Sequence, residues 1–467
     1  MKIVRKMKRK SNYLIVLLLV VLNGFSQTKE LTYNEFLGYV KKYHPLVKQA
    51  NLNISEAQAQ LMQARGAFDP KIEVDFDKKN FKDKDYYSLF NGSFKIPTWY
   101  GIELKAAFDN NEGMYVNPEN LTPTNGLTSV GIAIPVGQGL FINQRMADIR
   151  KAKLAQVLNT AERDLQALEI IHEASLRYFE WKRNYEEVKL YENYLKNAEL
   201  RFVGIKKLIE LGDKPAIDSI EAGITVKNRK LHLEDSSLKL IKARLALSNY
   251  LWTVDNIPLE IDESLIPDSN LKNTIEATLT KNGFQSFRVD NHPKIKAWKT
   301  KIDMLEIERK LKANSLLPKL DISYNYLSEP NYFSDYRFED YKIGLNFSMP
   351  LFLRKERAGV KLAQLKIEDS RYSSQFESLQ LQNKVKAQEY EITSLKKQLE
   401  YANGLVDDFD RMLKAEDRLF EIGESSLFII NTRENSLVSA QINTIAVENR
   451  LYNALIGLFQ SIGNTEL

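Results

Sequence analysis

Hydrophobic and polar residues alternate in five short segments of the chain, which predicts β-strands. In residues 71–77, Ile72, Val74 and Phe76 share one face, and charged residues lie between them. The same period of two recurs in residues 101–109, 129–136, 319–326 and 340–349. Aromatic residues gather near the ends of these segments, namely Tyr86, Tyr87, Trp99, Tyr100, Tyr332, Phe333, Tyr336 and Phe338. The pattern fits either an antiparallel sheet over a soluble core or the strands of a transmembrane β-barrel.

Hydrophobic residues at alternating spacings of three and four predict two very long helices. Residues 354–421 contain no proline and only two glycines. Their spacing is that of a coiled-coil seam, formed by Val385, Gln388, Ile392, Leu395, Leu399, Ala402, Val406, Phe409, Leu413, Glu416 and Phe420. Residues 154–179 show the same spacing. Each long helix, of about 66 residues and about 100 Å, is expected to turn at Gly212 or Gly423 into a return helix.

The chain contains two copies of one pattern. His44-Pro45 and His292-Pro293 begin the copies 248 residues apart, whereas Gly212 and Gly423 are only 211 apart. The difference arises because the first copy carries about 37 additional residues, within 83–125. These residues fit either an additional hairpin or a long external loop. Repeats of this size indicate duplication and not a solenoid.

The residues before the first copy have the layout of a secretory signal peptide. In residues 1–26 a basic start precedes the apolar run Leu14–Leu22, and the small residues Gly24 and Ser26 precede the expected cleavage site. As a helix this run would span about 14 Å, which is too short for a hydrocarbon layer of about 30 Å. No later stretch has 18 consecutive apolar residues. We therefore expect an exported chain without a transmembrane helix.

These patterns predict the domain organisation. After the signal peptide, a first repeat covers 27–252, with strands at about 70–137 and a helical hairpin at about 142–251. A linking, equatorial segment follows at 253–291. The second repeat covers 292–467, with strands at about 318–350 and a helical hairpin at about 354–463. The helices before and after each strand set must lie on the same side of a membrane. Each set must therefore cross the membrane an even number of times. Two crossings per copy are too few to close a barrel, so a barrel would have to be shared between subunits.

Composition and charge exclude several functions. The chain has no cysteine, which excludes disulfides, thiolate nucleophiles and cysteine-ligated metals. Without the six basic residues of the signal peptide the net charge of +5 becomes −1, so nucleic-acid binding has no electrostatic support.

No pattern of catalytic or metal-ligating residues stands out. The four histidines are far apart in sequence, and His44 and His292 precede prolines, which indicates structural turns. Asp407, Asp408 and Asp410 resemble a metal cluster, but they flank the helical seam and are expected to face water. We expect no enzymatic activity, no cofactor and no metal.

The order of several short motifs resembles the TolC-like outer-membrane efflux protein family over essentially the whole mature chain. The matching motifs are Leu31-Thr-Tyr-Asn-Glu-Phe36, both His-Pro pairs, Ser55-Glu-Ala-Gln-Ala-Gln-Leu61, Leu316-Leu-Pro-Lys-Leu-Asp-Ile-Ser323, Ile134-Pro135, Met349-Pro-Leu-Phe352 and the two glycine turns. The resemblance implies a mixed α and β fold: a long coiled-coil helical tube through the periplasm plus a transmembrane β-barrel shared by a homotrimer. Four strands from each chain would close a barrel of twelve. It also implies an exit duct for efflux or type I secretion, a passive conduit located in the outer membrane and reaching into the periplasm. The implied partners are outer-membrane lipid, a periplasmic adaptor (membrane fusion) protein and an inner-membrane pump.

In such proteins the tube closes where the long helices turn, so segments 211–222 and 422–434 form the candidate gate and adaptor-docking tip. The candidate residues in these two segments are Gly212, Asp213, Asp218, Glu221, Gly423, Glu424, Asn431, Arg433 and Glu434. Asp218 matches an acidic position of the family, although helix-dipole stabilisation also favours a carboxylate there. The second copy has Ile429 and Thr432 where acidic residues are expected. Any acidic ring at the mouth would therefore be thin, and Arg433 and Glu434 are candidates for gate ion pairs.

Two other classes of protein share some of these features. A soluble periplasmic coiled-coil adaptor or scaffold would also need heptads and export, but it would not need duplicated strand pairs with aromatic ends. A secreted hydrolytic or glycan-active enzyme would need convergent catalytic residues, which the sequence does not show.

Overall fold

A computed structural model describes residues 30–275, 287–332, 337 and 339–463. The predicted signal peptide, as well as Phe333, Tyr336 and Phe338, lies outside the described residues. The chain forms two compact units. One comprises Gln49–Gln166 and Arg288–Asn383, and the other comprises the chain up to Lys48, Ala167–Phe287 and Lys384–Leu467. Each unit therefore combines segments from both halves of the chain. The limits of the two repeats stay a prediction.

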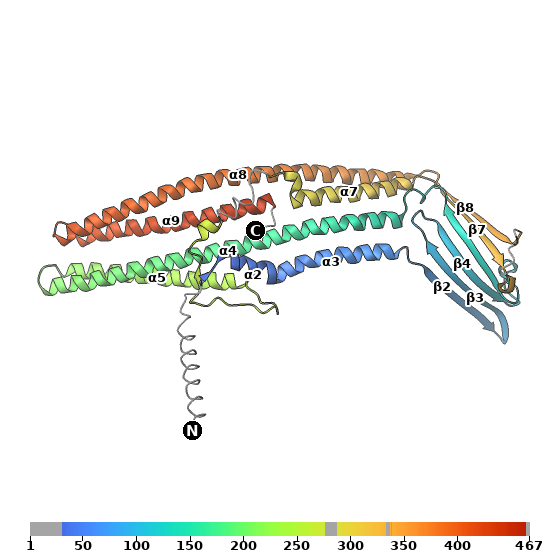
Figure 1. The fold of residues 1–467 in the computed structure, drawn as a ribbon, viewed down its shortest axis with the longest axis horizontal. Coiled ribbons are helices and arrows are strands. Elements are labelled where there is room, and N and C mark those ends of the chain that lie inside the picture. The colour runs from blue at the N-terminus through green and yellow to red at the C-terminus, as the bar shows by residue number, and fades with distance from the viewer. Residues whose placement is uncertain (1–29, 276–286, 333–336, 338, 464–467) are drawn as a thin grey trace, which may run out of the picture. The chain divides into compact units, whose positions relative to one another are not determined.

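The first unit contains a six-stranded sheet in which all neighbouring strands are antiparallel (Figure 1). In spatial order the strands are β2 (Lys71–Phe81), β3 (Lys84–Pro97), β4 (Glu103–Glu112), β5 (Leu127–Pro135), β7 (Lys319–Ser328) and β8 (Tyr341–Ser348). Strands β2 and β8 form the two edges. The alternating segments of the sequence are therefore strands, as predicted.

The additional residues of the first copy form strands. They supply β3 and β4, which pair with β2 and β5 on either side. The short 3₁₀ helix η1 (Pro118–Asn120) lies in the loop before β5. The additional residues thus make a further hairpin, and the expectation of four strands per chain is wrong for this chain. The physical reason is that both segments alternate apolar and polar residues and pair with each other from Ser88↔Glu112 to Pro97↔Glu103.

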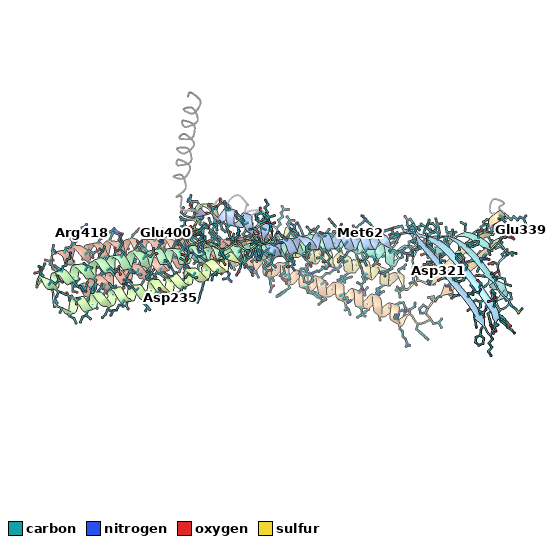
Figure 2. The ribbon with its side chains drawn as sticks, turned by 90° about the horizontal axis from the view of Figure 1, so that it is seen from below. Met62, Asp235, Asp321, Glu339, Glu400 and Arg418 are labelled. Carbon is teal, nitrogen blue, oxygen red and sulfur yellow. The ribbon has the colours of Figure 1, made fainter. Side chains whose placement is uncertain are left out.

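Helices lead into and out of the strands of this unit. α3 (Pro45–Gly66) precedes β2, and α4 (Gln144–Glu210) follows β5; α7 (Pro293–Asn314) precedes β7, and α8 (Arg354–Glu421) follows β8. The 3₁₀ helices η3 (Val289–Asn291) and η4 (Pro330–Tyr332) precede α7 and follow β7. Lys151 of α4 pairs with Glu308 of α7 at 3.5 Å. Figure 2 labels Met62 on α3 and Asp321 on β7.

The second unit is a helical bundle with the largest hydrophobic core. It contains α2 (Tyr33–Tyr43), α5 (Ile217–Ser248), α9 (Leu427–Ile462) and the later parts of α4 and α8. Tyr33, Tyr178 and Trp181 are almost fully buried, and the ring centroids of Tyr33 and Tyr178 are 5.4 Å apart. The predicted seam is the buried side of α8, including Val385, Ile392, Leu395, Leu399 and Ala402. α4 and α8 run for 67 and 68 residues without interruption, which confirms the two long helices.

The linking segment attaches to the beginning of the described chain. Strand β1 (Glu30–Leu31) pairs in parallel with β6 (Ile266–Pro267). The Tyr178 hydroxyl donates to the Leu31 carbonyl at 2.5 Å and accepts from the Asp268 N–H at 2.9 Å. Within the ranges that the structure describes, no helix is both long enough and apolar enough to cross a membrane.

The two His-Pro pairs lie at helix junctions. His44 ends α2 just before Pro45, is buried, and stacks on Tyr250 with ring centroids 5.3 Å apart. His292 begins α7, where its Nδ1 accepts a hydrogen bond from the Lys294 N–H at 3.1 Å. Both histidines therefore act in structural turns.

Candidate functional site

The sheet has one continuous apolar face. Cross-strand pairs place Ile72 opposite Phe94 and Ala106 opposite Val130, and Ile322 lies opposite Leu345. The register assigns to this face Ile72, Val74, Phe76, Phe90, Phe94, Leu104, Ala106, Phe108, Val130, Ile132, Ile134, Ile322, Tyr324, Tyr326, Tyr341, Ile343, Leu345 and Phe347. Several of these side chains are exposed, and 77% of Ile72 and 71% of Leu345 is accessible to solvent. A patch this broad and apolar is typical of a surface that meets lipid or another protein.

The opposite face of the sheet is polar. Its residues include Glu73, Asp75, Asp77, Asn91, Ser93, Lys95, Lys105, Asp109, Ser129, Asp321, Ser323, Asn325, Lys342 and Asn346. Glu73 and Lys95 form an ion pair across β2 and β3. At the helical end, Arg145 of α4 pairs with Glu103 of β4 at 2.6 Å. One apolar and one polar face, separated by a single layer of backbone, are what a strand wall between lipid and water requires.

Aromatic rings lie at both ends of the strands. Near the β2–β3 turn, Tyr86 stacks on Tyr115 with centroids 4.6 Å apart. Near the helices, Trp99 stacks on Phe68 with centroids 5.7 Å apart. Aromatic rings are enriched at both water interfaces of membrane-spanning sheets, so the prediction of aromatic strand ends agrees with the structure for these residues.

The two turns of the long helices have the same backbone geometry. Gly212 and Gly423 adopt φ of +82° and +83°. In each turn the glycine N–H donates to the carbonyl three residues earlier, and the next N–H donates to the carbonyl five residues earlier. This is the Schellman ending of a helix, which glycine favours because it has no Cβ. The return helix α9 is then capped by Ser426, whose side chain accepts from the Ile429 N–H.

Close to these turns, four charged residues from four helices form a cluster, here called the Glu434 cluster. Glu434 of α9 is 1% exposed, and its carboxylate lies 3.2 Å from Arg229 of α5 and 3.5 Å from Arg201 of α4. Arg201 also lies 4.0 Å from Asp417 of α8. Burial raises the pKa of Asp417; Arg201 opposes the shift and Glu434 adds to it. The cluster therefore links four helices of the bundle, α4, α5, α8 and α9.

The predicted site residues fall into three groups. Glu434, Asn431 and Arg433 bind within the subunit: Asn431 donates to Glu221 at 3.1 Å, and Arg433 lies 3.8 Å from Glu416. Asp213 and Glu424 are exposed at the turns, as are Gly212 and Gly423. Asp218 is half-buried in the first turn of α5. Residues 429 and 432 contribute no carboxylate: Ile429 is partly exposed, and the Thr432 hydroxyl donates to the Phe428 carbonyl at 2.8 Å.

Sequence reasoning missed the partners of Glu434. Arg229 is flanked along α5 by the buried Ala222, Val226 and Ser236, at helical spacing. Glu434 likewise lies between the buried Ile430 and Leu437. A charged residue at a buried seam position needs a buried partner of opposite charge. The positions of Arg229 and Glu434 in their seams are therefore the signal in the sequence that could have indicated this pairing.

The aspartates of α8 pair along their own helix. Asp408 accepts from Arg411 at 2.6 Å, and Asp410 accepts from Lys414 at 2.5 Å. Over the described parts of the chain, no group of three or more His, Asp or Glu side chains is arranged to hold a metal ion.

The comparisons with known proteins agree with these features. Residues 289–464 match the family model for outer membrane efflux proteins. Proteins with curated descriptions give no match.

Solved structures share the fold over most of the chain. The CmeC outer membrane channel of Campylobacter jejuni superposes with a TM-score of 0.64 at 13% identity, over 92% of this chain and 85% of that one. VceC of Vibrio cholerae gives 0.64 at 12% identity, over 92% and 96%. The open state of the MtrE channel of Neisseria gonorrhoeae gives 0.62 at 12% identity, over 92% and 88%.

These results confirm the TolC-like fold and the resemblance to the outer-membrane efflux protein family. The family match also agrees with the expected class, an outer-membrane efflux channel, and with the expected location in the outer membrane and periplasm. The matched family and solved structures are transport channels.

Proposed function

We propose that this chain is the exit duct of a multi-component efflux or type I secretion system. It is a passive conduit, formed by a homotrimer, that a periplasmic adaptor and an inner-membrane pump open. The chain itself catalyses no reaction and needs no cofactor. The observation that carries the proposal is the single apolar face that runs across all six strands.

The exposed apolar face favours a channel over a soluble adaptor or scaffold. In water, each exposed large apolar side chain forgoes about 1.5–3 kcal/mol that burial would supply. Val74, Phe76, Ile343 and Phe347 are each more than half exposed. Outer-membrane lipid removes this cost on the apolar face, while the polar face lines an aqueous interior.

The helical turns are proposed as the gate and adaptor-docking tip. Gly212, Asp213, Gly423 and Glu424 present an exposed surface at the turns. Farther from the turns, side-chain contacts connect neighbouring helices; they involve Glu221, Asn431, Arg433 and Glu434. Asp218, which is half-buried in the first turn of α5, is proposed to act on passing cations.

Planar lipid bilayers test the conduit and the gate together. Protein extracted from outer membranes with detergent should insert and give discrete ion-conducting steps. Asp218→Ala should weaken block by divalent cations, whereas Asp235→Ala, an exposed change farther along α5, should leave it unaltered. Folded protein that never conducts would refute the conduit. Conduction with identical block in all three proteins would remove Asp218 from the pore.

A further inference from the structure

The two edge strands of the sheet present complementary surfaces. Both faces of β2 and of β8 are exposed along almost their whole length. Their backbone groups on the outer side have no neighbouring strand within the described sheet. An open strand edge cannot be left unpaired inside a lipid layer, because nothing there can hydrogen-bond its N–H and C=O groups.

We propose that β2 pairs with β8 of a second copy of this chain, so that all six strands, including the β2–β3 hairpin, belong to the barrel wall. This inference rests on the proposed function. Three copies of six strands would close a barrel of eighteen. Because barrel diameter grows roughly linearly with strand number, the exit would be about 1.5 times wider than a barrel of twelve.

Strand direction and side-chain parity fit this pairing. β2 leads away from α3, whereas β8 leads back to α8, so adjacent copies meet antiparallel. If Ser348 lies opposite Lys71 at the helical ends, then Phe347 faces Ile72 and Leu345 faces Val74. The apolar face then continues without a break from one copy to the next.

Charge on the polar face also fits. In the same register Lys342 of β8 lies opposite Asp77 of β2, and a shift of two residues places it opposite Asp75. A shift of two in the other direction places Lys342 opposite Lys79 and is disfavoured by like-charge repulsion.

The alternative is a wall of four strands per chain, with the β2–β3 hairpin outside it and β8 pairing with β4. That arrangement would have to separate β3 from β4, which are paired from Ser88↔Glu112 to Pro97↔Glu103. It would also leave the apolar side chains of β2 outside a continuous wall. The observed pairing therefore favours six strands.

Cysteine cross-linking distinguishes the two walls, because the natural chain has no cysteine. Asn346→Cys is combined in the full chain with Lys71→Cys, Glu73→Cys or Asp75→Cys on β2. Oxidation in outer membranes should give covalent dimers and trimers for at least one of these pairs. The parity control, Asn346→Cys with Val74→Cys, should give none, because residue 74 lies on the opposite face.

A second set combines Asn346→Cys with Glu103→Cys, Lys105→Cys or Ala107→Cys on β4. Cross-linking in this set, or in neither set, would overturn the six-strand wall. The proposed function is judged separately, by the native mass and bilayer conductance of the unoxidised protein. A conducting trimer without β2–β8 cross-links would refute only the wall, whereas a soluble monomer would refute the channel itself.

Discussion

Removing the buried carboxylate of the Glu434 cluster should loosen the bundle near the helical turns. In Glu434→Gln, the guanidinium groups of Arg201 and Arg229 lose the negative charge that lies 3.5 and 3.2 Å from them. Breaking a buried ion pair by removing one partner typically costs 3–5 kcal/mol. Arg229 keeps its 2.7 Å hydrogen bond to Asn435, and Arg201 keeps Asp417 at 4.0 Å. We therefore expect the lower end of that range, about 3 kcal/mol.

Amide hydrogen exchange measures this effect locally. A loss of about 3 kcal/mol in opening free energy should accelerate exchange around Arg229 and Glu434 by about a hundredfold. Glu424→Gln, an exposed change at the turn, should alter exchange by no more than about twofold. The double variant Arg229→Met with Glu434→Gln should cost less than the sum of the single changes, because the two side chains act on each other. Equal exchange rates in Glu434→Gln and Glu424→Gln would refute the stabilising role of the buried Glu434 carboxylate.

Three further outcomes follow from the geometry. Gly212→Ala and Gly423→Ala should each lower the free energy of unfolding by about 1–2 kcal/mol, because a residue with a Cβ is strained at φ near +80°. Thermal unfolding measures this loss, and an unchanged midpoint would contradict it. Leu345→Lys, on the apolar face, should prevent stable assembly in the outer membrane at a cost of about 2–4 kcal/mol, whereas Asn346→Lys on the polar face should assemble normally, as membrane fractionation would show. Burial lowers the pKa of His44, so its stabilising contribution is present above a pH of about 6.5 and is lost as the pH falls. The unfolding midpoint of His44→Phe should therefore depend less on pH between about 7.5 and 5 than that of the natural protein.

The helices and strands could be predicted because their patterns are local. The seam from Val385 to Ala402 has helical spacing, and the segment contains no proline, so one long helix is the simplest outcome. The number of strands could not be predicted. The β2–β3 turn has Lys82 and Asp83 at φ of 53° and 56°, positions where Asn-Gly is the usual signal. Without that signal the additional residues could equally form a loop.

The candidate tip could be located from the sequence, but its contacts could not. The glycine turns are marked by residue type, and both have the expected left-handed backbone. Glu434, a candidate gate residue, lies buried and is bonded to Arg229, which is 205 residues away in the chain. A single sequence does not show which residues of different helices lie next to each other. Only the placement of each charge within its own seam could have indicated burial.

The native mass of the detergent-extracted protein shows whether the chain forms a trimeric membrane channel. The mature chain is purified from separated outer membranes, and its mass is measured with the detergent contribution subtracted. We expect three chains in one particle that needs detergent to stay in solution. A monomer recovered from the soluble periplasmic fraction would contradict the channel and would favour the coiled-coil scaffold.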